Sequence, residues 1–334
     1  MLQILNQTPF AAALTVSPNP KGIDTVIGVI KASFGMGTNG IHDVKRQPPV
    51  QVADVYWAEP GASSIKYASE LSLSKPATDI VMICHAVAPG NRPVKALQVS
   101  LTVGPYHKTL YVYGDRCWKG GFEFYRKTDP QPFTKKAVIY ENAFGGTDPD
   151  NPKRTEPRNP VGCGIKTETG RQLKVPNVID PKQLITSRFQ RPEPAGFGYI
   201  GPNWSQRAQY AGTYDETWKK QRAPFLPEDF DPRFFNAAHP DLIARGYLKG
   251  GEPVRIINVS SDGPLAFELP KIGFECVFEI AGQQTSVNPV MDTLLIEPDH
   301  NRFSMIFRAC ASCGKKVLQV ESMQVYPDQP KESA

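Results

Sequence analysis

The alternation of apolar and polar residues with a period of two constrains the fold more than any other feature of this chain. Apolar residues occupy every second position from 97 to 103, and a Gly-Pro pair then turns the chain into the segment LYVYG. Residues 272–280 alternate in the same way. Because successive side chains of a strand point to opposite faces, this pattern predicts antiparallel strands with one buried face. No segment shows a helical pattern of comparable length.

Further strands are predicted where β-branched and aromatic residues cluster. They cover residues 10–16, 23–34, 50–57, 80–83, 137–140, 254–259, 265–269, 293–296 and 303–307. No internal repeat of fixed period is present, which argues against a solenoid or a propeller. The sequence therefore predicts a mainly β protein, with antiparallel, sandwich-like β-rich lobes and a few short helices.

The composition changes between residues 144 and 202. In this stretch 17 of 59 residues are Gly or Pro, against 59 of 334 in the whole chain. Irregular passages of this length are usually functional, disordered or wrapped over a surface, and a loosely held connector is the alternative. We therefore divide the chain into an N-terminal β-rich lobe (1–143), an irregular Pro/Gly-rich connecting segment (144–202) and a C-terminal β-rich lobe (203–334).

The C-terminal lobe begins with an unusually aromatic segment. Residues 211–236, AGTYDETWKKQRAPFLPEDFDPRFFN, contain six aromatic residues in 26 positions, whereas the whole chain is 10% aromatic. We call these residues the aromatic clasp. Rings at this density must be buried in the fold or held ready for a partner, so the clasp is predicted to be either a structural brace or a recognition surface.

Helix signals divide the clasp into two short turns. Thr213 and Glu216 have the spacing of a capping box, which predicts a helix that starts at Thr213 and stops at Pro224. Tyr214 and Trp218 would then lie on one face of this helix, because they are four residues apart.

A second start signal follows further along the clasp. Asp231 can accept a hydrogen bond at the N-cap and Pro232 fixes φ at the next position, so we expect a second turn over residues 233–238. The clasp carboxylates could alternatively face each other across the cleft of a β-rich hydrolase. Capping explains several of them, so we prefer the structural interpretation and predict no catalytic residue; the carboxylates are Asp215, Glu216, Glu228, Asp229 and Asp231.

Charge and the chain start restrict the class of protein. The net charge of +5 comes from basic residues scattered among acidic ones, which does not indicate nucleic-acid binding. No Lys or Arg precedes Lys21, and no apolar run approaches membrane-spanning length. Six cysteines show no dense disulfide framework. We therefore expect a cytoplasmic protein with reduced thiols and with neither a membrane nor a nucleic acid as partner.

Two short motifs suggest cofactor sites that their surroundings do not support. Gly35, Gly37 and Gly40 match the dinucleotide fingerprint, but two prolines follow where a helix would have to begin, so a turn between strands is preferred. The CxxC of Cys310 and Cys313 supplies only half of a zinc site, with His300 or Cys276 as improvised partners. Two reduced thiols near a turn are the preferred interpretation, and we predict no cofactor and no metal.

An ordered series of elements gives the chain a family resemblance. The elements are KPATDIVMICHAVAPGNRPVKALQVSLTVG, VYGDRCW, YENAFGGTD, NPVGCG, PAGFGYIGPNW, the clasp and LLIEPD. Together they resemble the domain-of-unknown-function family 2169 over roughly residues 20–310, as one family domain. Its members are encoded near bacterial type VI secretion machinery. The resemblance implies a non-enzymatic adaptor or chaperone that holds a toxin effector and helps to load it onto the secretion spike.

The resemblance leaves the binding residues to be predicted from their chemistry. A client could add a strand to a sheet edge or dock on the clasp. Trp, Tyr and Arg are the usual hot-spot residue types, so the candidate partner contacts are Tyr214, Trp218, Arg222, Arg233, Phe234 and Phe235. The alternative, that these rings lock the two lobes together, applies most to Trp218 and Phe234. A β-rich hydrolase and a structural component of the secretion machine are the competing functions, and the oligomeric state stays open.

Overall fold

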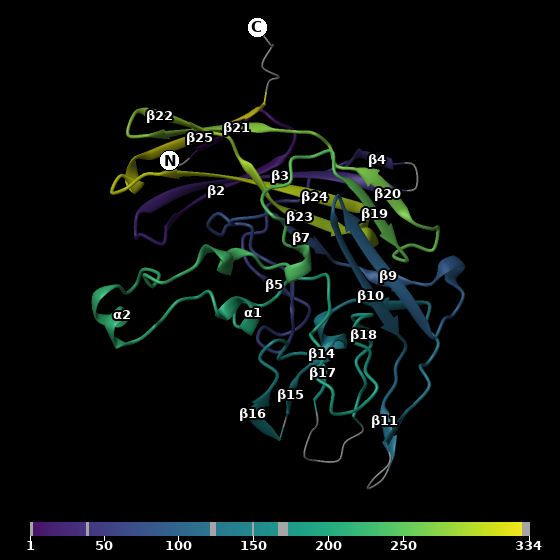
Figure 1. The fold of residues 1–334 in the computed structure, drawn as a ribbon. Helices are drawn as coiled ribbons and strands as arrows, with labels where there is room; N and C mark the ends of the chain where they lie inside the picture. Colours follow the sequence, from purple (N-terminus) through teal and green to yellow (C-terminus); the bar gives the residue numbers. More distant parts are fainter. Residues whose placement is uncertain (1–2, 38–39, 121–124, 149, 166–172, 329–334) are drawn as a thin grey trace.

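The computed structural model describes residues 3–37, 40–120, 125–148, 150–165 and 173–328, and its main body is a sandwich of two β-sheets (Figure 1). The larger sheet has the order β2 (Ala11–Pro18), β3 (Asp24–Gly37), β24 (Arg302–Ser312), β23 (Val290–Glu297) and β7 (Asp79–Met82), with β4 (Gly40–Asp43) paired to β3. Its pairings are antiparallel except that of β23 with β7. The prediction of a mainly β protein with antiparallel sheets and few short helices is confirmed.

The smaller sheet of the sandwich has the order β1 (Gln3–Asn6), β25 (Val320–Pro327), β21 (Phe274–Ile280) and β22 (Gln283–Val287). Phe274 joins the two layers, because its ring centroid lies 5.7 Å from that of Phe10 and 5.0 Å from that of Phe307. Gly28 allows the layers to approach closely: a Cβ atom there would come within 2.3 Å of the Met323 sulfur. The alternating residues 272–280 thus bury one face of β21, as predicted.

Strand β3 is buried along almost its whole length, and its two faces differ. One face packs on the smaller sheet, whereas the other carries charged groups that are closed off from water. Lys31 pairs with Glu70 at 2.6 Å, and Arg308 of the adjacent β24 pairs with Asp292. Burial raises the pKa of Glu70 in spite of the Lys31 charge. Buried charges must be paired to be tolerated, so these contacts hold residues of the 47–75 segment against the sheet.

A third sheet stands beside the sandwich. Its order is β18 (Val178–Ile179), β10 (Tyr106–Tyr113), β9 (Ala96–Val103), β19 (Pro253–Ile257) and β20 (Leu265–Glu268). The predicted hairpin of residues 97–103 is its centre, formed by β9 and β10 in antiparallel register. This sheet and the larger sheet of the sandwich each combine strands from the N-terminal and C-terminal parts of the chain.

Most of the predicted strands are present, and two are wrong over most of their length. Within residues 50–57 only β5 (Val55–Tyr56) forms, because the Gln51 amide donates to the Glu70 side chain instead of to a strand. Residues 137–140 leave β13 (Lys135–Ala137) and enter a 3-10 turn, Tyr140–Asn142, where the Asn142 side chain donates to the Ala137 carbonyl.

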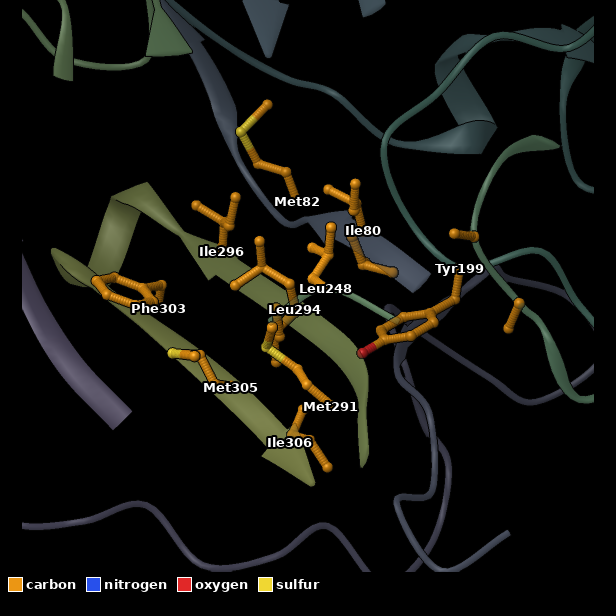
Figure 2. Close-up of a cluster of buried hydrophobic side chains, with 14 of the residues drawn as sticks. Ile80, Met82, Tyr199, Leu248, Met291, Leu294, Ile296, Phe303, Met305 and Ile306 are labelled. Carbon is orange, nitrogen blue, oxygen red and sulfur yellow. The ribbon is translucent and has the colours of Figure 1, made fainter. Parts of the chain in front are cut away.

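The described part of the irregular passage packs against the body. Its short strands are β14 (Phe144–Gly145), β15 (Thr147–Asp148), β16 (Asn151–Thr155), β17 (Cys163–Gly164) and β18, which joins the third sheet. Asn159 is fully buried and donates to the carbonyls of Tyr140 and Phe144. Figure 2 shows Tyr199 reaching a cluster of side chains from β7, β23 and β24. The passage therefore contributes to the core.

The remaining elements are short. Strands pair as β5 with β6 (Ile65–Tyr67), β8 (His85–Val87) with β13, and β11 (Trp118–Gly120) with β12 (Tyr125–Lys127). The α-helices are α1 (Ser205–Ala208) and α2 (Glu216–Gln221). The 3-10 helices are η1 (Pro89–Asn91), η2 (Tyr140–Asn142), η3 (Pro232–Phe235), η4 (Pro240–Leu242), η5 (Pro298–His300) and η6 (Val317–Gln319).

Candidate functional site

The aromatic clasp extends sideways from the body and carries α2 near its far end (Figure 1). None of the residues of α2 is buried. A helix this short does not form stably on its own, because most helical stability in proteins comes from packing an apolar face. Local contacts within the clasp must therefore hold α2 in place.

The first of these contacts is the helix cap, and the residue that supplies it differs from the prediction. Asp215 is the N-cap and accepts a 2.8 Å hydrogen bond from the Trp218 amide. Thr213 instead donates its amide and its hydroxyl to Asp229, at 2.9 and 2.7 Å. The predicted capping box of Thr213 and Glu216 is wrong, because the returning chain offers Thr213 a carboxylate. The helix ends before Pro224, as predicted.

Tyr214 and Trp218 form the aromatic pair expected from their spacing, but Tyr214 precedes the N-cap and lies outside α2. Their ring centroids lie 4.7 Å apart in an edge-to-face arrangement. The Trp218 indole nitrogen donates to the Phe225 carbonyl at 2.8 Å, so this ring braces the loop. Tyr214 has no such tie and is 52% exposed. Trp218 thus orients Tyr214 toward solvent.

The far end of the clasp is attached to the turn between β2 and β3. Arg222 donates to the Leu226 carbonyl at 2.9 Å and, through a second nitrogen, to the Pro20 carbonyl. The Phe225 ring lies against Gly22, whose φ of +74° and missing side chain leave room for it. Arg222 is therefore occupied within the fold. Sequence reasoning did not select Phe225, although its place in the aromatic run was a signal.

The second turn of the clasp begins where it was predicted and ends earlier. Asp231 accepts from the Arg233 amide at 2.9 Å and starts η3, which ends at Phe235. The predicted turn over residues 233–238 is too long, because Asn236 leaves the turn and donates to Asp79 in the body. The Arg233 side chain pairs with Asp231 and lies 4.4 Å from the centroid of the Tyr210 ring.

Phe234 and Phe235 anchor the base of the clasp. Together with the buried Phe230 they form a three-ring cluster whose centroids lie 5.3–6.0 Å apart. The Arg207 guanidinium lies 5.0 Å from the Phe234 ring centroid, and Phe235 packs on the main core. The six candidate contacts therefore separate into an exposed Tyr214 and Arg233, a bracing Trp218, and Arg222, Phe234 and Phe235, which are engaged with the fold.

A hollow of about 350 Å³ lies inside the clasp, between α2 and Pro227, Glu228 and Asp229. Hydrogen bonds from Thr213 lower the pKa of Asp229. The pKa of Asp231, near the base of the clasp, is lowered by its bond from Arg233. The general acid of a glycosidase needs the opposite, a raised pKa. These two carboxylates act as ionised hydrogen-bond acceptors that shape the clasp.

A second polar cluster lies on the third sheet. The buried Lys108 ammonium is 2.7 Å from Asp241 and 3.8 Å from Asp180. The neighbouring His239 accepts from the Asp241 amide at 3.2 Å. Burial, with the Lys108 charge, lowers the pKa of His239 to about 4. This histidine is neutral at physiological pH and caps η4 as a structural acceptor, whereas the Lys108–Asp241 pair joins η4 to β10.

The glycine and cysteine motifs have structural settings. Gly37 pairs with Gly40 across β3 and β4, so the glycine-rich segment lies between two strands as predicted, with residues 38–39 outside the described part. The Cys310 sulfur lies 3.0 Å from the Ser74 hydroxyl, whereas the Cys313 thiol donates to the Asp24 carbonyl at 3.2 Å. The two sulfurs therefore have different partners.

Neither a cluster of metal ligands nor a membrane-spanning helix is present in the part of the chain that the structure describes. There, no three His, Cys, Asp or Glu side chains are grouped so that they could hold a metal ion. Among the same residues, no helix has both the length and the apolar character needed to cross a membrane.

Comparison with known proteins places the chain in a family. Residues 21–308 match the family described as "Uncharacterized protein conserved in bacteria (DUF2169)". No curated protein and no solved structure matches the chain. The match begins before β3, includes the whole clasp and ends within β24, so it covers most of the sandwich and the third sheet. The chain therefore belongs to this bacterial family.

Proposed function

We propose that this protein is a non-enzymatic adaptor that binds a toxin effector through the aromatic clasp and helps to load it onto the type VI secretion spike. The observation that carries the proposal is the clasp itself. Its helix buries none of its residues, yet caps, an indole hydrogen bond and the contact with the β2–β3 turn hold it in one conformation. Such a pre-ordered, exposed element suits recognition, because little conformational entropy is lost on binding.

The side chains that the clasp presents are of the kinds that dominate binding energy. Tyr214 is half exposed, Phe225 is partly exposed, and Arg233 lies at the base on the same segment. Aromatic and arginine side chains supply most hot spots at protein interfaces. Lys219, Lys220 and Glu216 surround the rings on α2 and would form a polar rim.

The client of the clasp is an unfolded or extended effector segment in this proposal. The protein would shield that segment in the cytoplasm and release it to the spike by competition, without nucleotide hydrolysis. A stable complex of this kind buries at least about 800 Å² on each partner. We expect the client to continue from the clasp onto the adjoining turn between β2 and β3, which the clasp contacts through Arg222 and Phe225.

Affinity purification from the native bacterium, with and without toxin expression, tests the proposal. The tagged wild-type chain should retain a toxin or a spike component, identified by mass spectrometry. The double variant Tyr214→Ala/Phe225→Ala should lose it, while the control Leu318→Ala, which removes an even more exposed apolar side chain outside the clasp, should keep it. Recovery of the chain alone in every sample would contradict the proposal.

A further inference from the structure

A second surface, remote from the clasp, concentrates positive charge. It surrounds the β11–β12 hairpin, at the opposite side of the molecule from α2 in Figure 1. Backbone pairing brings the side chains of this surface together. Strand β11 pairs with β12, and the backbone of Cys117 forms an isolated antiparallel β-bridge with that of Lys174. Within the described residues no ion pair joins any of these cations to a carboxylate; the cations, which we call the basic end, are Arg116, Lys119, Arg126, Lys127 and Lys174.

The hairpin places two of these charges directly opposite each other. Lys119 and Arg126 are cross-strand partners. Like charges at such positions destabilise a sheet, and an isolated two-stranded hairpin has little stability to spare. On the other face of the hairpin, burial and the Arg116 charge lower the pKa of Lys127. The arrangement is unfavourable for the free protein and favourable once an anion covers it.

The hairpin is nonetheless held in place. Trp118 packs in a small separate core with Val175, Ile179 and Ile185. The Lys127 ammonium donates to the Ile185 carbonyl at 2.5 Å. The repelling cations are therefore fixed close together and cannot relax by moving the strands apart.

A hollow of about 450 Å³ opens between these cations. Arg116, Lys119 and Lys174 contribute to its lining, and the buried Nε–H of Arg116 has no acceptor among the residues that the structure describes. Two carboxylates also line it, but each already has a cation: Asp115 pairs with Lys136, and Asp129 pairs with Lys95 at 3.2 Å. The unbalanced charge of the hollow is positive, and one of its lining residues, Arg116, has a buried donor without a partner in the described part of the chain.

Exposed rings lie on the Lys127 face of the hairpin, because Tyr125 and Lys127 are two residues apart on β12. The Arg188 guanidinium stacks 3.5 Å from the centroid of the Tyr125 ring and 4.7 Å from that of Phe189. Phe189 is 70% exposed. Rings and cations together fit a polypeptide with both apolar and acidic side chains. A nucleic acid, whose charge is dense and regular, would bring phosphates against Asp115 and Asp129.

We propose that the basic end binds an acidic, aromatic- or leucine-bearing segment of a partner polypeptide, with one carboxylate entering the hollow beside Arg116. This goes beyond the proposed function and does not rest on it, because the basic end and the clasp share no residue. A protein with both surfaces can hold two polypeptides at the same time.

Fluorescence anisotropy of the full chain tests the proposal. The probe is a fluorescein-labelled peptide in which Glu and Asp alternate with Tyr and Leu, and its counterpart carries Gln and Asn at the acidic positions. The wild type should bind the acidic probe at least about tenfold more tightly than the counterpart, and the variant Lys119→Glu/Arg126→Glu should lose this preference. The matched control Lys315→Glu/Lys316→Glu, an exposed doublet with the same charge change, should keep it.

Melting curves separate a binding role from a structural one. The single variant Lys119→Glu replaces the repelling pair with an attractive one, so its Tm should equal or exceed that of the wild type while its affinity falls. The proposal is overturned if the acidic probe does not bind at low salt, or if both double variants weaken it equally. Tighter binding of a single-stranded DNA oligonucleotide than of the acidic probe would also overturn it, and would assign the surface to nucleic acid.

Discussion

The sandwich and the aromatic clasp each contain an Arg–Asp ion pair, but the two pairs differ in burial and therefore in role. In the sandwich, the side chains of Arg308 and Asp292 are 1% and 0% exposed, and the guanidinium also donates to two backbone carbonyls. In the clasp, Arg233 and Asp231 form a similar pair, but the Arg233 side chain is 62% exposed. Removing either partner of the first pair leaves the other charge uncompensated in the core, whereas the second pair is accessible to a partner protein. Residue type alone therefore does not separate structure from recognition; burial does.

The largest expected effect comes from breaking the buried pair. Arg308→Ala leaves the Asp292 carboxylate uncompensated in the core and should lower the free energy of unfolding by about 3–5 kcal/mol. Arg233→Ala should leave the free energy of unfolding unchanged, because this pair is exposed. Urea unfolding followed by circular dichroism measures both. Equal losses in the two variants would mean that the clasp is as much a part of the folding unit as the sheet.

Aromatic side chains give a parallel contrast. Phe303 is fully buried and stacks on Phe34 and Phe267, so Phe303→Ala should cost about 3–5 kcal/mol through lost burial and a cavity. Tyr214→Ala should change the free energy of unfolding by less than about 1 kcal/mol, because this residue is about half exposed and contributes little to the core. Binding of the client should show the opposite order: Tyr214→Ala should weaken it, whereas Phe303→Ala protein that is still folded should bind as the wild type does. A Tyr214→Ala protein that unfolds readily would reveal the clasp as a structural brace.

Mild acid should weaken the body through His239. Its pKa of about 4 in the fold lies below the usual 6.5, so the unfolded chain takes up the proton first as the pH falls. Stability is therefore full above about pH 6.5 and decreases toward pH 4, by at most about 3 kcal/mol. His239→Gln should flatten this part of the profile, and His42→Gln, at an exposed histidine, should not. The clasp contains no histidine, so no histidine of the clasp contributes to the loss of stability between pH 6.5 and pH 4.

The smallest expected effect is local to the clasp. Asp215→Ala removes the N-cap of α2 and should destabilise that helix by about 1 kcal/mol. Hydrogen exchange of the amides in residues 216–221 should become faster, while amides of β3 and β24 exchange as in the wild type. Faster exchange in those strands as well would show that the clasp and the sandwich open together.

The sequence predicted the strands of the body better than the contacts of the clasp. Alternation identifies β9, β10 and β21 because each buries one face in a regular sheet. The prediction of a strand from clustered β-branched and aromatic residues fails for residues 50–57. There the Gln51 amide donates to the buried Glu70 carboxylate instead of to a neighbouring strand. In the clasp, the Tyr214–Trp218 pair follows from local spacing.

Contacts made over longer distances were missed for a common reason. The partner of Thr213 is 16 residues away and that of Arg222 is 202 residues away, so no local pattern contains either contact. The basic end escaped notice in the same way, because its cations come from three separate segments. Such sites need the fold before they can be recognised.

Site-specific photocrosslinking tests the central claim, that the clasp is a docking surface for a polypeptide, most directly. Benzoylphenylalanine is placed at Tyr214, and at Leu318 as a control, because Leu318 is 96% exposed and lies outside the clasp. Irradiation of the native cells should join position 214 to an effector polypeptide and leave position 318 without that product. No product at position 214, or the same products at both positions, would contradict the claim.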